Sequence, residues 1–217
     1  MSLDRIRDLL TQLPSHSLVH GGSHSGKLYQ NYPWPPLDVL PAHRNDTQQR
    51  LDWLLEKLGD VQDRYILDVG CANGAISIGL ALCGARVNGI CPDHSEIAIA
   101  REAAGIMGAD VGFYGVDVTD LPSTPRNTVI FLSVWKWIVR NKGLTSAKTT
   151  LRILSNCDDF IFESGLTDGG MDLGIGITKA DIPAILREHT GCEPELLGIE
   201  PREDGTEREV WRCRRNG

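Results

Sequence analysis

The chain has 217 residues, enough to bury a full hydrophobic core, and no stretch of it approaches the ~20 consecutive apolar residues that span a bilayer. Its 22 basic and 29 acidic residues give a net charge of −7, which disfavours broad binding to nucleic acid or an anionic membrane. The first 13 residues carry charges throughout and do not read as a signal peptide, so we expect a cytoplasmic protein that does not bind membranes.

Residues 1–13 have the spacing of a short amphipathic helix that Pro14 would end. Residues 15–41 follow as a long stretch rich in Gly, Ser, His, Pro and aromatics, and irregular segments of this length tend to be lids or binding loops. We therefore predict an N-terminal helix with a lid-like segment over residues 1–44, before a domain of residues 45–217. Tyr29 and Trp34 are its candidate substrate-binding residues.

Three histidines, His16, His20 and His24, repeat every four residues in this stretch. On a helix they would share one face, but Gly21 and Gly22 disfavour a helix and no carboxylate lies nearby to complete a metal site. We expect no metal. Solvated loop histidines and a share in a substrate site both remain open, with His24 as one candidate base.

The six cysteines contain no Cys-x-x-Cys pair and several fall in apolar runs. Buried free thiols are the favoured interpretation over disulfides or zinc.

A helix capped by Asn45 or Asp46 and ended by Gly59 is predicted to lead into the central stretch, Tyr65 to Gly79. There an apolar strand to Val69 is followed by a glycine turn and a helix that begins near Gly74. In an open α/β sheet this arrangement puts backbone amides and a helix N-terminus opposite a ligand at the carboxyl end of the strand.

The turn reads Asp68-Val-Gly70-Cys-Ala72-Asn-Gly74. It resembles the first motif of the class I S-adenosylmethionine-dependent methyltransferases, Asp/Glu-x-Gly-x-Gly-x-Gly, with alanine at the middle glycine. A dinucleotide-binding Gly-x-Gly-x-x-Gly does not fit this spacing. The resemblance implies a Rossmann-like three-layer αβα sandwich, whose seven-stranded, mostly parallel sheet has an antiparallel last strand. It also implies S-adenosyl-L-methionine as cofactor, lying along Asp68, Gly70, Cys71, Ala72, Asn73 and Gly74.

The second strand is expected over residues 85–90, and the resemblance places an acidic ribose ligand at its end. Cys91 occupies that position, followed two residues later by Asp93. Either Asp93 reaches back to the ribose or the ribose is held differently. After a helix of residues 95–107, capped by Ser95, and a strand of residues 110–114, the resemblance assigns Asp117 and Val118 to the adenine.

The fourth strand, residues 128–133, runs into Ser133-Val-Trp135-Lys136-Trp137, where cofactor and substrate would meet. We expect Ser133 at the cofactor and Trp135 and Lys136 at the substrate, although the tryptophans could equally pack in the core. The motif typical of adenine amino methylation is absent. Leu132 to Trp137 resembles the methyltransferases that cap RNA 5′-phosphates, but the histidine expected next is missing.

Helices are expected over residues 144–154 and 182–189, a strand over 159–163, a glycine-rich lid loop over 167–177, and a final hairpin of residues 195–199 and 209–214. These strands complete the seven.

The sequence thus resembles a methyltransferase that methylates oxygen on a small molecule, a sugar or a terminal group. Lys136, Glu163 and His24 are the candidate bases, by position alone. An RNA-end or tRNA-modifying enzyme is one alternative, prompted by the basic tail, and a non-catalytic protein that binds the cofactor is another. The acceptor and the oligomeric state stay open.

Overall fold

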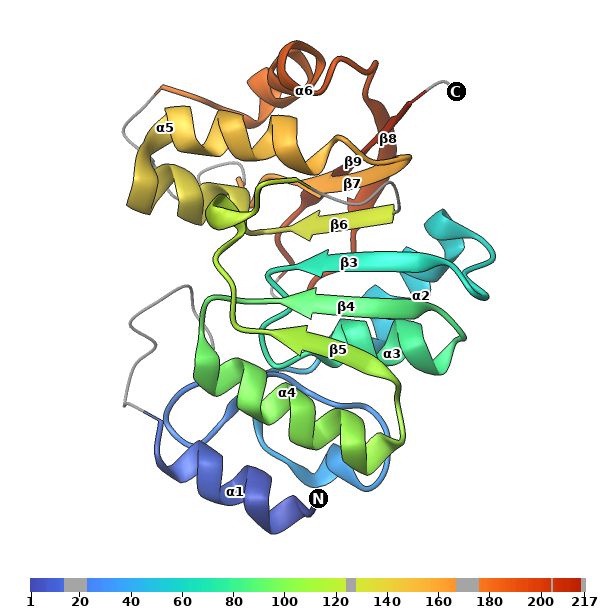
Figure 1. Ribbon diagram of the computed structural model, residues 1–217, viewed down its shortest axis with the longest axis vertical. Helices are drawn as coiled ribbons and strands as arrows, with labels where there is room; N and C mark the ends of the chain where they lie inside the picture. The colour runs from blue at the N-terminus through green and yellow to red at the C-terminus, as the bar shows by residue number, and fades with distance from the viewer. Residues whose placement is uncertain (14–22, 124–127, 167–175, 204, 216–217) are drawn as a thin grey trace. The chain divides into compact units, whose positions relative to one another are not determined.

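The computed structural model describes residues 1–13, 23–123, 128–166, 176–203 and 205–215. The chain forms two compact units, Met1–Asp117 and Val118–Gly217 (Figure 1). This division differs from the boundary predicted after residue 44, which stays a prediction.

In its described residues, the first unit contains three strands of the main sheet, four helices and a two-stranded N-terminal sheet. Its elements in chain order are α1 (Leu3–Thr11), β1 (Leu28–Gln30), the 3-10 turn η1 (Leu37–Val39), β2 (Ala42–Arg44), α2 (Thr47–Leu58), β3 (Tyr65–Val69), α3 (Ala75–Leu82), β4 (Arg86–Ile90), α4 (His94–Met107) and β5 (Val111–Tyr114).

Strands β3, β4 and β5 are parallel, in the order β5-β4-β3. The register pairs Val69 with Ile90, so both strands end at the same level. The loops that follow β3 and β4 therefore lie side by side at one edge of the sheet, as a parallel sheet requires.

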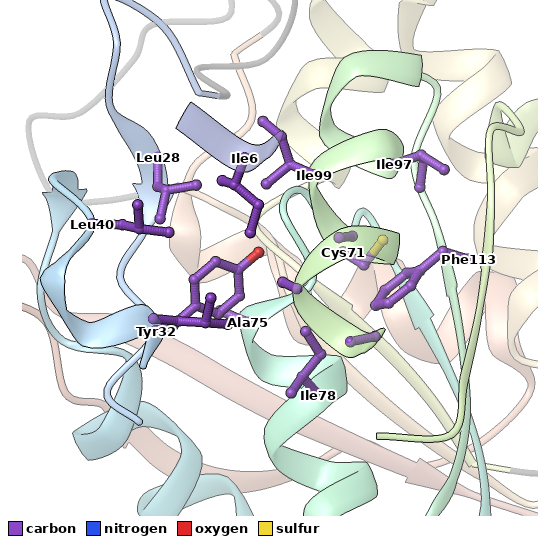
Figure 2. Packing of buried hydrophobic residues seen from close by; sticks show 14 of the residues in the cluster. Ile6, Leu28, Tyr32, Leu40, Cys71, Ala75, Ile78, Ile97, Ile99 and Phe113 are labelled. Atoms are coloured by element: carbon purple, nitrogen blue, oxygen red, sulfur yellow. The ribbon is translucent and has the colours of Figure 1, made fainter. Parts of the chain in front are cut away.

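The segment predicted as an irregular lid has regular structure where it is described. Strands β1 and β2 pair in parallel, Leu28 with Ala42 and Gln30 with Arg44. Tyr32 and Leu37 are fully buried in an apolar cluster with α1, α3 and α4 (Figure 2). The described part of the segment is thus built into the first unit.

Helix ends follow local capping chemistry. Ser2 caps α1 by accepting a hydrogen bond from the Arg5 amide, and Gly59 ends α2 with φ 74°. The cap of α4 is Asp93, one residue before the helix, and not Ser95 as predicted. The Asp93 carboxylate accepts from two amides of the first turn, which satisfies donors that the helix itself leaves open.

The second unit holds the other four strands of the main sheet. Its elements are the 3-10 turn η2 (Val118–Asp120), β6 (Thr128–Leu132), α5 (Trp135–Leu154), β7 (Asp159–Glu163), the 3-10 turn η3 (Lys179–Asp181), α6 (Ile182–Thr190), β8 (Glu195–Glu200) and β9 (Arg208–Arg214). Helix α5 has two parts: the helix predicted from Leu144, and a preceding part from Trp135 that was not predicted. Gly143, with φ 82° and ψ 166°, breaks it internally.

Strands β6 and β7 are parallel, whereas β9 is antiparallel to both β7 and β8 and lies between them. Phe131, Phe160 and Phe162 form an aromatic core with centroids 5.9 to 6.2 Å apart. Three strands in the first unit and four in the second confirm the predicted Rossmann-like α/β class, with a seven-stranded, mostly parallel sheet and an antiparallel last strand. Among the described residues, no helix is long and apolar enough to cross a membrane.

Candidate functional site

The loop from Gly70 to Gly74 joins β3 to α3 through three left-handed residues, Gly70 (φ 82°), Ala72 (φ 48°) and Gly74 (φ 78°). The amides of Gly70 and Cys71 donate to the Ile90 carbonyl at 2.8 and 3.1 Å, which fixes the loop to the end of β4. Alanine in this conformation costs about 1 kcal/mol because its Cβ crowds the following carbonyl. The loop is therefore held in a strained, specific shape.

Gly74 is required by space as well as by its backbone angle. A Cβ at this position would lie 2.6 Å from the Phe113 ring and 2.9 Å from the Ala100 Cβ. The chain can thus enter α3 pressed against α4 and β5 only without a side chain here, and the loop keeps backbone alone on that side.

Asp68 lies at the end of β3, with its side chain buried beside α3. It accepts a hydrogen bond of 2.5 Å from the Ser77 hydroxyl. Burial raises its pKa to about 6, while the Ser77 hydrogen bond and the charge of Arg50 act in the opposite direction. Its predicted contact with the cofactor stays a prediction.

Asn73 is fully buried and bonds to the N-terminal segment. Its side chain accepts from the Gln30 amide at 3.2 Å and donates to the Gln30 carbonyl at 2.9 Å. The Tyr32 hydroxyl donates to the Asn73 carbonyl. The sequence did not predict the contacts of Gln30 and Tyr32 with Asn73, because nothing local in the chain connects them to a loop about 40 residues away.

At the end of β4, Cys91 is buried and its amide donates to the Tyr114 carbonyl at 3.2 Å. Burial raises the pKa of its thiol to about 12, so it is neutral near pH 7. Asp93 follows as the cap of α4, its Oδ1 accepting from Ser95 and Glu96 amides at 2.8 and 3.3 Å. Whether Cys91 or Asp93 contacts a ribose stays open.

Asp117 follows β5 and Val118 is buried in η2, and their adenine roles also stay predictions.

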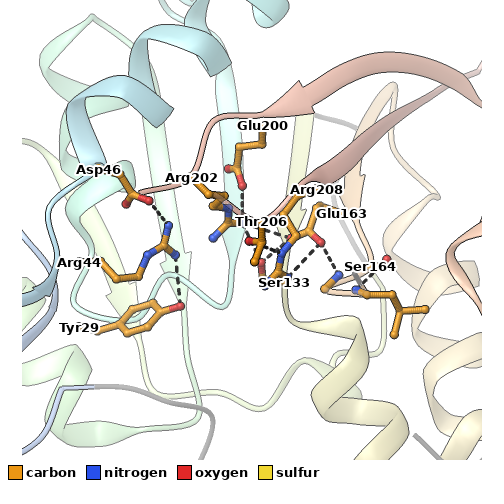
Figure 3. A network of polar contacts seen from close by, with 12 residues as sticks. Tyr29, Arg44, Asp46, Ser133, Glu163, Ser164, Glu200, Arg202, Thr206 and Arg208 are labelled. Atoms are coloured by element: carbon orange, nitrogen blue, oxygen red, sulfur yellow. Dashed lines mark hydrogen bonds and ion pairs between the residues drawn. The ribbon is translucent and has the colours of Figure 1, made fainter. Parts of the chain in front are cut away.

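In the second unit, Ser133 and Glu163 stand at the ends of β6 and β7. Ser133 adopts φ 64°, and its hydroxyl donates to Glu163 Oε2 (Figure 3). The Glu163 side chain is 1% exposed, and its Oε1 accepts from the Gly165 amide. Both carboxylate oxygens therefore already hold partners within this unit.

Two arginines from the β8–β9 end pair with the same carboxylate. Arg202 lies 3.3 Å from Glu163 Oε2 and also pairs with Glu200, while Arg208 lies 3.6 Å from Glu163 Oε1. The Arg202 guanidinium further donates to the Ser133 hydroxyl at 3.0 Å. Glu163 thus organises the ends of these strands, and acting as a base would require it to give up a partner.

The Lys136 side chain packs against Gly165: a Cβ added to Gly165 would lie 2.5 Å from the lysine Cδ. Its Nζ lies 5.5 Å from the centre of the Trp137 ring. Trp135 is fully buried and packs edge-on against Phe162, with centroids 6.3 Å apart. This corrects the expectation of a substrate contact at Trp135, because in this structure it belongs to the core.

The N-terminal candidates Tyr29, Trp34 and His24 belong to the first unit. The Arg44 guanidinium carbon lies over the Tyr29 ring, 5.8 Å from the ring centre. A Cβ added to Gly79 would lie 2.9 Å from the Trp34 indole. His24 stacks on His43 with centroids 3.9 Å apart. Packing accounts for the position of Trp34, and the substrate roles of Tyr29 and Trp34 remain predictions. His16, His20 and residues 167–175 of the predicted glycine-rich lid lie outside the described residues.

Comparison by sequence finds relatives for part of the chain. The Ubiquinone biosynthesis O-methyltransferase of Alkalilimnicola ehrlichii is 33% identical over 88 residues, 41% of this chain and 36% of that protein. The protein of the same name from Bordetella avium is 39% identical over 87 residues, 40% of this chain and 36% of that protein. The chain thus spans about a third of the length of these curated relatives. No protein-family model matches it.

Comparison by structure covers more of the chain. The crystal structure of WbdD, a bifunctional kinase-methyltransferase, has a TM-score of 0.70 at 24% identity, over 96% of this chain and 46% of that one. The magnesium protoporphyrin IX methyltransferase of Synechocystis PCC 6803, crystallised with bound SAM, has a TM-score of 0.62 at 21% identity, over 78% of each chain. The chain therefore has the fold of the class I S-adenosylmethionine-dependent methyltransferases, and the resemblance read from Asp68 to Gly74 is confirmed.

Proposed function

We propose that the chain is an S-adenosyl-L-methionine-dependent methyltransferase that methylates an oxygen atom of a small molecule. The observation that carries the proposal is the loop from Gly70 to Gly74 at the carboxyl end of β3. Its two glycines have left-handed backbone conformations and leave the backbone uncovered by their own side chains. The named O-methyltransferases, similar to this chain over about 40% of its length, support the choice of oxygen as the acceptor atom.

The residues present fit this cofactor. Glycine at position 74 lets the chain enter α3 pressed against Phe113 and Ala100, and the amides in the first turn of α3 suit a ligand with a carboxylate. Asp68 to Gly74, Cys91 or Asp93, Asp117, Val118 and Ser133 are the residues that would hold it. The bound sulfonium would supply a methyl group that is already activated.

The chain's own task is then proximity and alignment, which can supply roughly 7 kcal/mol. A hydroxyl acceptor must also lose a proton. Of the three candidate bases, Glu163 already holds partners on both oxygens. Lys136 is the second residue of α5, four positions after the end of β6. We therefore propose Lys136 as the general base, in preference to His24 and Glu163.

Transfer of tritiated methyl from S-adenosylmethionine to a panel of phenols, catechols, sugars and 5′-phosphorylated RNA oligonucleotides tests the proposal. We expect label on a hydroxyl compound, and a rate at least 100-fold lower in Lys136→Met. Lys148→Met, a lysine of the same helix, should leave the rate within a factor of two. Label only on RNA, or on nothing while the cofactor binds, would contradict the proposed acceptor and favour the RNA-modifying or the non-catalytic alternative respectively.

A further inference from the structure

The strand β1 is bonded on both edges. One edge pairs with β2, and the other meets the Asn73 side chain, which bonds to both the amide and the carbonyl of Gln30. Two residues later the Tyr32 hydroxyl reaches the Asn73 carbonyl. Asn73, a single residue of the glycine loop, thus makes three hydrogen bonds with a segment about 40 positions away, two as acceptor and one as donor.

The segment has a second anchor at the start of α4. The Ser23 amide and hydroxyl both donate to the Glu96 carboxylate in the first turn of α4, the hydroxyl at 3.0 Å. The Ser23 hydroxyl in turn accepts from the Tyr29 amide at 2.8 Å. Glu96 is 2% exposed, so these bonds are shielded from water. The anchors therefore fall on the loop that follows β3 and on the first turn of the helix that follows β4.

The loop needs such support. Ala72, at φ 48°, stands at the position where the family motif has a glycine, and an alanine disfavours this conformation. Strained residues persist only where the surroundings fix them. The next residue, Asn73, is fully buried and held on its side chain and its carbonyl together.

We propose that Gln30, Tyr32 and Asn73 form a latch that positions the Gly70–Gly74 loop to receive the cofactor. The proposal rests on the proposed function for the identity of the ligand. Tyr32 and Asn73 act as positioning residues, since their described contacts are with each other, with Gln30 and with the apolar cluster. The N-terminal segment is then part of the cofactor site through the loop it holds.

Tyr32→Phe removes one bond of the latch and keeps the buried ring, and Asn73→Ala removes the two side-chain bonds. Tyr65→Phe is the matched control, because Tyr65 is exposed at the start of β3 and its hydroxyl accepts a hydrogen bond from Arg86 at the start of β4, outside the latch. We expect the Kd for S-adenosylhomocysteine, measured by calorimetry at 25 °C, to rise 3- to 10-fold in Tyr32→Phe and at least 10-fold in Asn73→Ala. The control should stay within a factor of two.

Amide hydrogen exchange of the ligand-free protein separates positioning from general loss of stability. Faster exchange confined to residues 70–74 in both latch variants, with rates in β3 and β4 unchanged, is the expected result. Unchanged affinity and unchanged exchange in two folded variants would overturn the latch. Because the exchange experiment uses no ligand, failure of the native protein to bind S-adenosylhomocysteine would count against the proposed function, whereas exchange alone would then decide the latch.

Discussion

Replacing Glu96 with glutamine should stabilise the protein above neutral pH, because burial makes ionisation of this carboxyl unfavourable. Burial raises the pKa of Glu96 from 4.5 to about 7, and the nearby Asp93 charge adds to the effect, while the Ser23 bonds oppose it. Glutamine keeps an oxygen that accepts from the Ser23 amide and gains an amide group that donates to the Ser23 hydroxyl. The variant therefore removes the charge and retains the anchor.

The direction follows from proton binding. Between pH 4.5 and about 7 the folded protein holds a proton on Glu96 that the unfolded chain releases, so the native protein loses stability as pH rises through this window. A shift of this size corresponds to about 3 kcal/mol at pH 8 and vanishes below pH 4.5. The other groups that face Glu96, Tyr32, Cys71 and Cys91, stay neutral here because burial raises each pKa.

Urea unfolding at pH 4.5, 6, 7 and 8.5 measures this difference. Glu96→Gln should match the native protein at pH 4.5 and exceed its free energy of unfolding by up to about 3 kcal/mol at pH 8.5. Glu56→Gln, at an exposed position, should show no trend with pH. A difference between Glu96→Gln and the native protein that is the same at every pH would refute the reasoning.

Three further substitutions test the strain and the buried charges. Ala72→Gly should raise the free energy of unfolding by about 1 kcal/mol, seen as a higher Tm, because glycine adopts φ 48° without strain; a lower Tm would contradict this. Gly74→Ala should lower it by about 3 kcal/mol, since the new Cβ would lie 2.6 Å from a ring carbon; wild-type stability in urea would contradict the packing. Glu163→Gln should lower it by about 3 kcal/mol, because Arg202 and Arg208 would lose their shared carboxylate; a loss below about 0.5 kcal/mol would show the cluster to be dispensable.

The sequence predicted those parts of the fold whose signal is local. An apolar run ending in Gly70 and a helical pattern from Gly74 define β3 and α3, and the structure places them at Tyr65–Val69 and Ala75–Leu82. Local signals also compete: Asp93 and Ser95 are both residue types that cap helices, and the structure shows that Asp93 caps α4. The helix predicted from Leu144 follows the break at Gly143, whereas the helical turns that begin at Trp135 were not predicted, although their residues Trp135, Ile138 and Val139 are buried.

The site was predicted only where one stretch of chain builds it. Strands β1 and β2 have three residues each, too few for a periodic pattern, and their stability comes from pairing and from Asn73. The polar cluster around Glu163 likewise joins residues from β7 and the β8–β9 end that are about 40 positions apart. Such contacts depend on tertiary structure, which no single segment encodes.

Calorimetric titration with S-adenosylhomocysteine tests the central claim most directly, with NAD as the competing ligand and Asp117→Asn beside the native protein. We predict binding of S-adenosylhomocysteine with a Kd in the micromolar range, about −8 kcal/mol, weakened roughly 10-fold in the variant, and no binding of NAD. Binding of NAD, or no binding of S-adenosylhomocysteine to the folded native protein, would contradict the account.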